Sequence, residues 1–290
     1  MSALLEISSL YLDIGQPILR GVSLQVAEGE VHGLVGESGA GKTMVGKCVL
    51  GLLPDGAKIG HGYINFAGTE LLKLHGHERR GLLGRDITLI PQNPMTALNP
   101  VKRIEPQIID VLQLHLKMTE ANAKRRALAL MHDVHIREPA RVLQQFPHEL
   151  SGGMRQRVLI AIAFACKPKL IIADEPTTAL DVTVQRQILR LIKELQADSG
   201  TAILFIAHDL GVVAKICNRV SVIHSGRILE SNTTAELFAQ PQHAYTRALF
   251  AATPRFDRPA EALHPVPPEL IESLWAEAKA HDAGKANGWR

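Results

Sequence analysis

The sequence predicts an α/β fold with a parallel β-sheet at its centre. The main observation is a pair of wholly apolar, β-branched runs, "KLIIAD" at 169–174 and "AILFIAH" at 202–208, separated by a helical pattern at 182–198. Strand, helix and strand in this order form a parallel unit covered on both faces. Short apolar stretches at the start and a long helical region in the middle predict two smaller parts around this core.

The first 35 residues predict a small antiparallel β region that leads into a buried strand. Glycine and proline interrupt the apolar stretches, and apolar residues alternate with polar ones at Val22, Leu24 and Val26. This period of two is typical of strands with one buried face. Near the other end of the core, "RVSVIHSGRILES" predicts a β-hairpin that turns at Ser225 and Gly226.

Residues 93–166 predict a helical subdomain inserted into the core. Two helical patterns, "IEPQIIDVLQLHL" and "EANAKRRALALMHDV", lie between proline-containing stretches. After about residue 241 the chain is richer in proline and alanine, and its last residues predict one more helix with a frayed end.

The composition is that of an ordinary globular protein. A chain of 290 residues with 46% apolar and 21% charged residues folds into one or two structural units. A net charge of +3 is too small to indicate nucleic-acid binding. We expect no leader and no membrane span, because no window of about 18 apolar residues lacks a charge. Cys48, Cys166 and Cys217 occur singly, so we expect buried thiols in a reducing compartment.

The stretch "GESGAGKT" lies between a predicted strand and a predicted helix and fits a phosphate-binding turn. Glycines at positions 36, 39 and 41 let the backbone bring several N–H groups around one anion, and the start of the helix adds its positive dipole end. We expect Lys42 to contact the terminal phosphates and the Thr43 hydroxyl to bind magnesium. The alternative is a glycine-rich turn with an incidental lysine. The predicted cradle comprises Gly36, Glu37, Ser38, Gly39, Ala40, Gly41, Lys42, Thr43 and Met44.

A second candidate element follows the predicted strand "LIIAD". Asp174 and Glu175 lie at its carboxyl end, where parallel α/β sheets bind their ligands. We expect Asp174 to support the magnesium ion and Glu175 to polarise the attacking water. Taken alone, such a pair is also typical of a solvated turn or a helix cap.

The stretch "LSGGMRQR" predicts a second helix start that binds an anion, with Ser151 as N-cap and exposed amides at Gly152 and Gly153. With both anion sites in one chain, the sequence resembles the ATP-binding cassette (ABC) family, whose signature is an LSGGQ-type motif. Met154 replaces the usual glutamine, and Gln156 is the glutamine that remains nearby as a candidate contact. The resemblance implies that two cassettes pair head to tail, with each ATP between the cradle of one and the signature helix of the other.

The same resemblance assigns roles to four further residues. Gln92 matches the glutamine that contacts magnesium and the attacking water, and Asp181 of "TALD" matches the loop that crosses to the partner cassette. His208 matches the histidine that contacts the terminal phosphate, and Tyr11 matches the aromatic residue that stacks on adenine. The alternatives are a polar loop residue for Gln92, a helix N-cap for Asp181, a capped core histidine for His208 and a half-buried strand residue for Tyr11.

The resemblance implies a P-loop NTPase (RecA-like) core with an antiparallel β subdomain and the inserted helical subdomain. It covers residues 1–255 as the ATP-binding domain, followed by a C-terminal extension at 256–290. The segments "PQNPMTALNPV" and "QPQHAYTRALFAATP" are similar to those of ATPase subunits of bacterial dipeptide, oligopeptide and nickel importers. Many of these relatives carry a cysteine cluster for an iron–sulfur centre near the C-terminus. We expect none here, because residues 240–290 contain no cysteine.

The function expected from this resemblance is ATP hydrolysis coupled to uptake of a small solute, most plausibly di- and oligopeptides. The cofactors are ATP and Mg²⁺, and the partners are transmembrane permease subunits, a second ATPase subunit and, indirectly, an extracytoplasmic solute-binding protein. The chain would lie on the cytoplasmic face of the bacterial inner membrane as a peripheral subunit, without nucleic acid. The alternatives are nickel or another small solute as cargo, or an ABC ATPase that works away from membranes. The histidines at 61, 75 and 77 are interpreted as surface residues.

Overall fold

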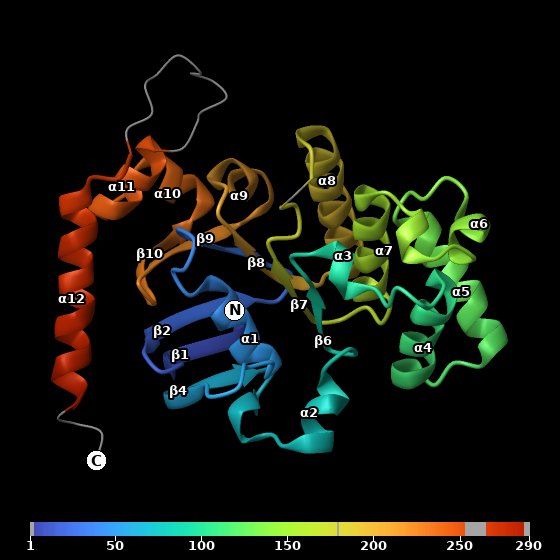
Figure 1. Ribbon diagram of the computed structural model, residues 1–290, viewed down its shortest axis with the longest axis horizontal. Helices are drawn as coiled ribbons and strands as arrows, with labels where there is room; N and C mark the ends of the chain where they lie inside the picture. The colour runs from blue at the N-terminus through green and yellow to red at the C-terminus, as the bar shows by residue number, and fades with distance from the viewer. Residues whose placement is uncertain (1–2, 179, 253–264, 287–290) are drawn as a thin grey trace. The chain divides into compact units, whose positions relative to one another are not determined.

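The computed structural model describes residues 3–178, 180–252 and 265–286. The chain divides into two compact units, one made of Met1–Leu74 and Leu204–Arg290 and the other of His75–Ile203 (Figure 1). The predicted domain boundary at residue 255 and the predicted frayed end lie outside the described residues.

An antiparallel sheet forms the first part of the first unit, with strand order β2-β1-β4-β5. In β2 (Pro17–Ala27) the side chains of Val22, Leu24 and Val26 are buried and the residues between them are exposed. This confirms the alternation predicted from the sequence. The other strands are β1 (Ala3–Asp13), β4 (Lys58–Phe66) and β5 (Thr69–Glu70), which the short 3₁₀ helix η1 (Leu71–Lys73) follows.

The second sheet region of this unit has the order β10-β9-β3-β8. The strand β3 (Val31–Val35) is buried throughout and pairs in parallel with β9 (Arg219–His224). A hairpin then joins β9 to β10 (Arg227–Thr233), and it turns at Ser225 and Gly226 as predicted. The helices that follow these strands are α1 (Lys42–Leu50), α9 (Leu210–Ile216) and α10 (Thr234–Ala239).

The second unit contains the βαβ unit predicted from the sequence. The strands β6 (Ile87–Ile90) and β7 (Leu170–Asp174) are parallel, and α8 (Val182–Ser199) connects β7 to β8 (Ala202–Ala207). The strand β8 begins in this unit, where the order is β8-β7-β6, and continues into the first unit. Because β7 and β8 carry apolar residues on both faces, both strands are buried along nearly their whole length.

Helices α3 to α7 fill the segment between β6 and β7 and confirm its predicted helical character. The long helices α4 and α5 pack against each other and against α7. The helices of this unit before β7 are α2 (Gly76–Leu82), α3 (Pro94–Ala97), α4 (Ile104–Leu116), α5 (Glu120–Asp133), α6 (Pro139–Leu143), η2 (Pro147–Glu149) and α7 (Gly152–Phe164).

The end of the described chain consists of α11 (Ala244–Ala251) and α12 (Pro268–Ala286), both in the first unit. The helix α12 runs beside β2 (Figure 1). Its main polar anchor is Asp282, whose two carboxylate oxygens each accept a hydrogen bond from Arg20 Nε at 3.0 Å. Within the described residues, no helix combines the length and the apolar character needed to cross a bilayer.

The cysteines only partly match the expectation. Cys48 and Cys217 are buried as predicted, but Cys166 is half-exposed because it lies just beyond the end of α7. All three thiols are free. Burial raises the pKa of the Cys166 and Cys217 thiols, so both remain protonated at neutral pH.

Candidate functional site

The predicted phosphate turn lies between β3 and α1 in the first unit. Lys42 is 5% exposed, and its ammonium group donates hydrogen bonds to the backbone oxygens of Gly36 and Glu37, both at 2.8 Å. Within the described chain, no side chain caps α1, whose N-cap is Gly41. The positive end of the helix and the buried ammonium therefore face the same turn, which is the arrangement that binds a phosphate chain.

Two glycines of the turn are required by its geometry. A Cβ at Gly36 would lie 2.1 Å from the backbone oxygen of Ile223, so the first residue of the turn has no room for a side chain. Gly41 has φ of 103°, in the left-handed region, and a Cβ there would lie 2.8 Å from Leu19 Cδ2. The hairpin after β9 also supports the turn, because Gly226 N–H donates to Ala40 O at 3.0 Å. These contacts explain why the sequence has glycine at these two places.

His208 belongs to the same unit as the turn. It follows β8 directly and is exposed, and the next residue, Asp209, is the N-cap of α9. Its exposure argues against the alternative of a core histidine. The imidazole at this strand end is accessible to solvent, and a side chain must be accessible to contact a bound phosphate.

The stacking of Tyr11 on adenine stays a prediction, and the structure shows which residues surround its ring. Tyr11 and Leu12 are successive residues of β1 and point to opposite faces of the sheet. Leu12 pairs with Leu19, which Gly41 of the turn approaches. The Tyr11 ring lies on the other face and stacks on His281 of α12, with ring centroids 6.0 Å apart. Tyr11 is half-buried in its strand, as the alternative interpretation also expects.

The carboxylates predicted for hydrolysis lie at the end of β7 in the second unit. Asp174 is the last residue of the strand and is half-buried. Glu175 follows with φ of 46°, a left-handed conformation, and its Oε2 accepts hydrogen bonds from Gln92 Nε2 and Thr178 Oγ1, both at 3.0 Å. The structure thus brings Glu175 and Gln92 together, as expected of a base and a residue that share one water. The contact from Thr178 was not predicted.

The signature segment begins α7 as predicted. Ser151 is the N-cap, and its hydroxyl accepts a hydrogen bond from the Met154 N–H at 3.3 Å. Ser151 and Gly152 are exposed, so this helix start is open to a ligand. Gln156 corrects the expectation, because its side chain is 1% exposed and faces the interior from α7. A residue so buried does not contact a nucleotide from another chain.

Asp181 is the N-cap of α8. Its Oδ1 accepts hydrogen bonds from the N–H groups of Thr183 and Val184 at 3.0 and 2.9 Å. The carboxylate is also exposed, so the capping role and a contact to a second cassette are compatible. Ala179, in the same loop, lies outside the described residues.

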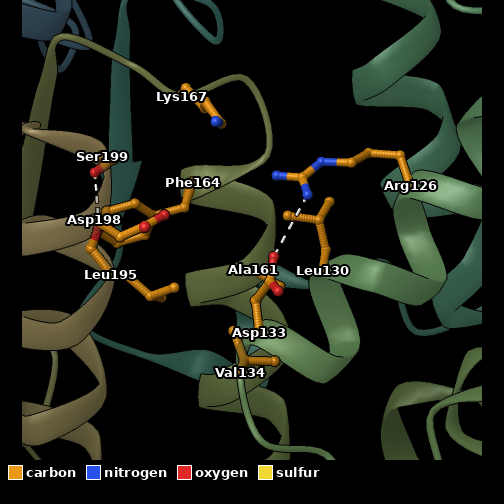
Figure 2. A pocket seen from close by; sticks show the side chains of 10 residues that line it. All are labelled: Arg126, Leu130, Asp133, Val134, Ala161, Phe164, Lys167, Leu195, Asp198 and Ser199. Carbon is orange, nitrogen blue, oxygen red and sulfur yellow. Dashed lines mark hydrogen bonds and ion pairs between the residues drawn. The ribbon is translucent and has the colours of Figure 1, made fainter.

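A small cavity in the second unit is a separate feature (Figure 2). Its volume is about 30 Å³, which admits water but is far too small for a nucleotide. Arg126 pairs with Asp133 at its edge, at 3.4 Å. The cavity is lined by Arg126, Leu130, Asp133, Val134, Ala161, Phe164, Lys167, Leu195, Asp198 and Ser199.

The residues present fit a nucleotide carried with a metal ion. In the described part of the chain, no group of three or more His, Cys, Asp or Glu side chains could hold a metal ion. Histidines 61, 75 and 77 are exposed, as predicted. Mg²⁺ bound through phosphates needs few protein ligands. The first unit offers the half-buried Thr43 hydroxyl for this role, and the second unit separately offers the half-buried Asp174 carboxylate.

Sequence reasoning missed the support of the phosphate turn by the C-terminal part of the chain. His224 at the end of β9 and Tyr245 in α11 lie beside Glu37 of the turn. The segment containing Tyr245 was noted for its similarity to importers, but no motif predicted a contact with the turn.

Comparison with known proteins agrees with this geometry. The chain matches the family model of the ABC transporter over residues 19–178 and that of the oligopeptide/dipeptide transporter C-terminal region over residues 229–279. A probable peptide ABC transporter ATP-binding protein of Sinorhizobium fredii is 48% identical over 257 residues, which are 88% of this chain and 77% of the relative. A dipeptide transport ATP-binding protein of Bacillus subtilis is 45% identical over 87% of this chain and 77% of its own length.

Solved structures show the same fold. A dimeric ATP-binding cassette in a post-hydrolysis state, bound to ADP and Pi, is similar with a TM-score of 0.70 and 25% identity, over 79% of this chain and 98% of that one. The protein cbiO1 of Clostridium perfringens, part of the ABC transporter complex cbiONQ, also has a TM-score of 0.70 and 25% identity, over 83% of this chain and 92% of that one.

Proposed function

The chain belongs to the ABC transporter family, and from this membership we propose that it is the ATP-hydrolysing subunit of a bacterial importer of di- and oligopeptides. Its ATPase identity follows from the family and from the cassette fold. The observation that carries the cargo proposal is the second match, over residues 229–279, to a C-terminal region described for oligopeptide and dipeptide transporters.

ATP binds through its phosphates at the turn that follows β3. The Lys42 ammonium moves from the backbone oxygens of Gly36 and Glu37 to the terminal phosphates, and the first amides of α1 bind the remaining oxygens. Thr43 and Asp174 would hold Mg²⁺, directly or through water, and the ion would supply neutralisation of charge on the phosphates. The whole cradle, Gly36 to Met44, takes part through its backbone.

Hydrolysis uses Glu175 as the general base. The hydrogen bonds from Gln92 and Thr178 hold its carboxylate in one orientation, so that it can take a proton from the attacking water. Gln92 would contact both that water and the metal. His208 contacts the terminal phosphate as negative charge develops there.

A complete site requires a second cassette, either a copy of this chain or a related subunit. The exposed helix start at Ser151, Gly152 and Gly153 covers the phosphates held by the partner, and Asp181 contacts the partner across the interface. A solved dimeric cassette with the same fold supports this arrangement. Closure of the pair on ATP then converts binding energy into a conformational change.

The remaining partners follow from the transport role. Transmembrane permease subunits bind the cassettes at the cytoplasmic face of the inner membrane, and an extracytoplasmic solute-binding protein delivers the cargo. Relatives named for peptide, dipeptide and oligopeptide transport match most of the chain, at 42–48% identity, which supports peptides over nickel as the cargo.

Uptake by a strain that lacks this subunit tests the proposal. We expect loss of uptake of a radiolabelled dipeptide and tripeptide, restoration by the wild-type gene, and no restoration by Lys42→Ala. Radiolabelled nickel is measured in parallel. Loss of nickel uptake with normal peptide uptake would contradict the proposed cargo. The transport role would be contradicted if uptake of both solutes stayed normal and the chain were purified in a soluble complex that contains no permease.

A further inference from the structure

Glu37, the second residue of the phosphate turn, lies beside the end of β9. The strands β3 and β9 are parallel, with Val35 opposite Val222, so continuation of the register brings Glu37 alongside His224. The two side chains meet there, with His224 Nδ1 at 3.8 Å from Glu37 Oε2. The imidazole is buried, and the carboxylate is 39% exposed at the surface of the turn.

Tyr245 of α11 completes this cluster from the C-terminal part of the chain. Glu230 of β10 holds the start of α11, because its carboxylate accepts the N–H groups of Gln242 and His243 at 2.8 and 2.9 Å. The Tyr245 side chain is completely buried, and its ring is tilted against the His224 ring with centroids 4.5 Å apart. The anchored helix thus carries a phenol to the underside of the phosphate turn.

Three polar atoms of this cluster lack hydrogen bonds in the described structure. They are Nδ1 and Nε2 of His224 and the hydroxyl oxygen of Tyr245. Burial raises the pKa of Tyr245, and the Glu37 carboxylate raises it further, so the phenol stays protonated and can donate. Burial also lowers the pKa of His224. Nearby His243 lowers it further, whereas Glu37 raises it. Buried polar groups without partners are costly, and Glu37 is the acceptor within reach.

We propose that Tyr245 and His224 are positioning residues for ATP binding, which hold the Glu37 carboxylate away from the triphosphate. A carboxylate in a phosphate-binding turn repels the anion that the turn must accept. Small side-chain shifts from the 3.8 Å separation between His224 and Glu37 let the phenol and the imidazole donate hydrogen bonds to Glu37 and draw its carboxylate towards the β9 side of the turn. This also keeps the Glu37 backbone in the shape that Lys42 contacts. The C-terminal region therefore contributes to nucleotide affinity. This inference rests on the nucleotide site proposed above.

The test is Tyr245→Phe, which removes one hydroxyl and keeps the ring against His224. Binding of Mg-ATP to the purified full-length chain is measured by isothermal titration calorimetry, at a temperature where hydrolysis is negligible. We expect the Kd to rise about threefold to tenfold, the range for loss of one net hydrogen bond. In a Glu37→Gln background the carboxylate charge is absent, so the same substitution should leave the Kd unchanged.

Thr246→Val is the matched control. Thr246 is the next residue of α11 and is equally buried, but its hydroxyl interacts with Glu230 instead of Glu37. We expect a lower Tm with an unchanged Kd. An unchanged Kd for Tyr245→Phe, or an equal rise in the Glu37→Gln background, would overturn the inference. If the wild-type chain itself does not bind Mg-ATP, the nucleotide site fails instead, so the two failures are distinguishable.

Discussion

The contact between Arg20 and Asp282 should determine how firmly α12 is held against β2. The guanidinium is 9% exposed and Asp282 is 27% exposed, so the pair is largely withdrawn from water. Arg20 Nη1 also donates to the Ser225 oxygen at 2.9 Å, in the hairpin that supports the phosphate turn. Asp282→Asn removes the negative charge and leaves a nearly buried cation with neutral acceptors.

The magnitude follows from the geometry. The Arg20 Nε hydrogen is shared between two oxygens at 3.0 Å, which corresponds to one charge-assisted hydrogen bond and not to a forked pair. Such a bond contributes about 1.5–3 kcal/mol, and the asparagine retains part of it. We therefore expect a loss of about 1.5 kcal/mol, or a roughly tenfold larger population of chains in which α12 is detached.

Hydrogen exchange of the α12 amides measures this population directly. The rates over Pro268–Asp282 should rise about tenfold in Asp282→Asn, while those of β3 stay the same. Glu277→Gln is the control on the same helix, because Glu277 is 61% exposed and lies 3.6 Å from Arg227, so its effect should be close to zero. Equal exchange in both variants would refute the reasoning.

Three further outcomes follow from the site. Lys42→Ala should raise the Kd for Mg-ATP about 10- to 100-fold in calorimetry, because a buried charge-assisted donor is lost; an unchanged Kd would contradict the cradle. Glu175→Gln should keep the Kd and lower the rate of phosphate release at least about 100-fold, with the closed dimer accumulating in size-exclusion chromatography; normal release would exclude Glu175 as the base. Glu230→Gln should lower the Tm at pH 7. Burial opposes ionisation of Glu230, but the nearby Thr246 hydroxyl and the N–H groups of Gln242 and His243, which donate to its carboxylate, leave the folded-state pKa below its usual 4.5. This contribution is present above pH 4.5 and lost as the pH falls through the folded value, so the difference in Tm from wild type should shrink there, and a constant difference would argue against the cap.

Much of the fold could be predicted because it depends on local patterns. The helices α4 and α5 span the residues of the two helical stretches quoted from the sequence, and the βαβ unit at β7, α8 and β8 has the predicted order. The phosphate turn was equally predictable. The spacing of its glycines, lysine and threonine between a strand and a helix is a local pattern, and the left-handed φ of 103° at Gly41 is one that glycine adopts readily.

The features that local patterns could not predict are side chains whose surroundings come from distant parts of the chain. Tyr11 was assigned by its position upstream of the turn, but the face of β1 on which it lies depends on pairing with β2 and on α12. Gln156 was assigned by proximity to the signature, whereas the rotation of α7 buries it. The cluster of Glu37, His224 and Tyr245 joins residues up to 208 positions apart, and no local pattern records such contacts.

The backbone of Glu175 has a consequence for engineered forms of this ATPase. A left-handed φ of 46° costs a residue with an ordinary side chain about 1 kcal/mol, whereas glycine and, to a lesser extent, asparagine adopt it readily. Glycine at 175 would relieve this cost but would also lose the hydrogen bonds from Gln92 and Thr178. A glycine variant should therefore lose less stability than the loss of those two hydrogen bonds alone would cause.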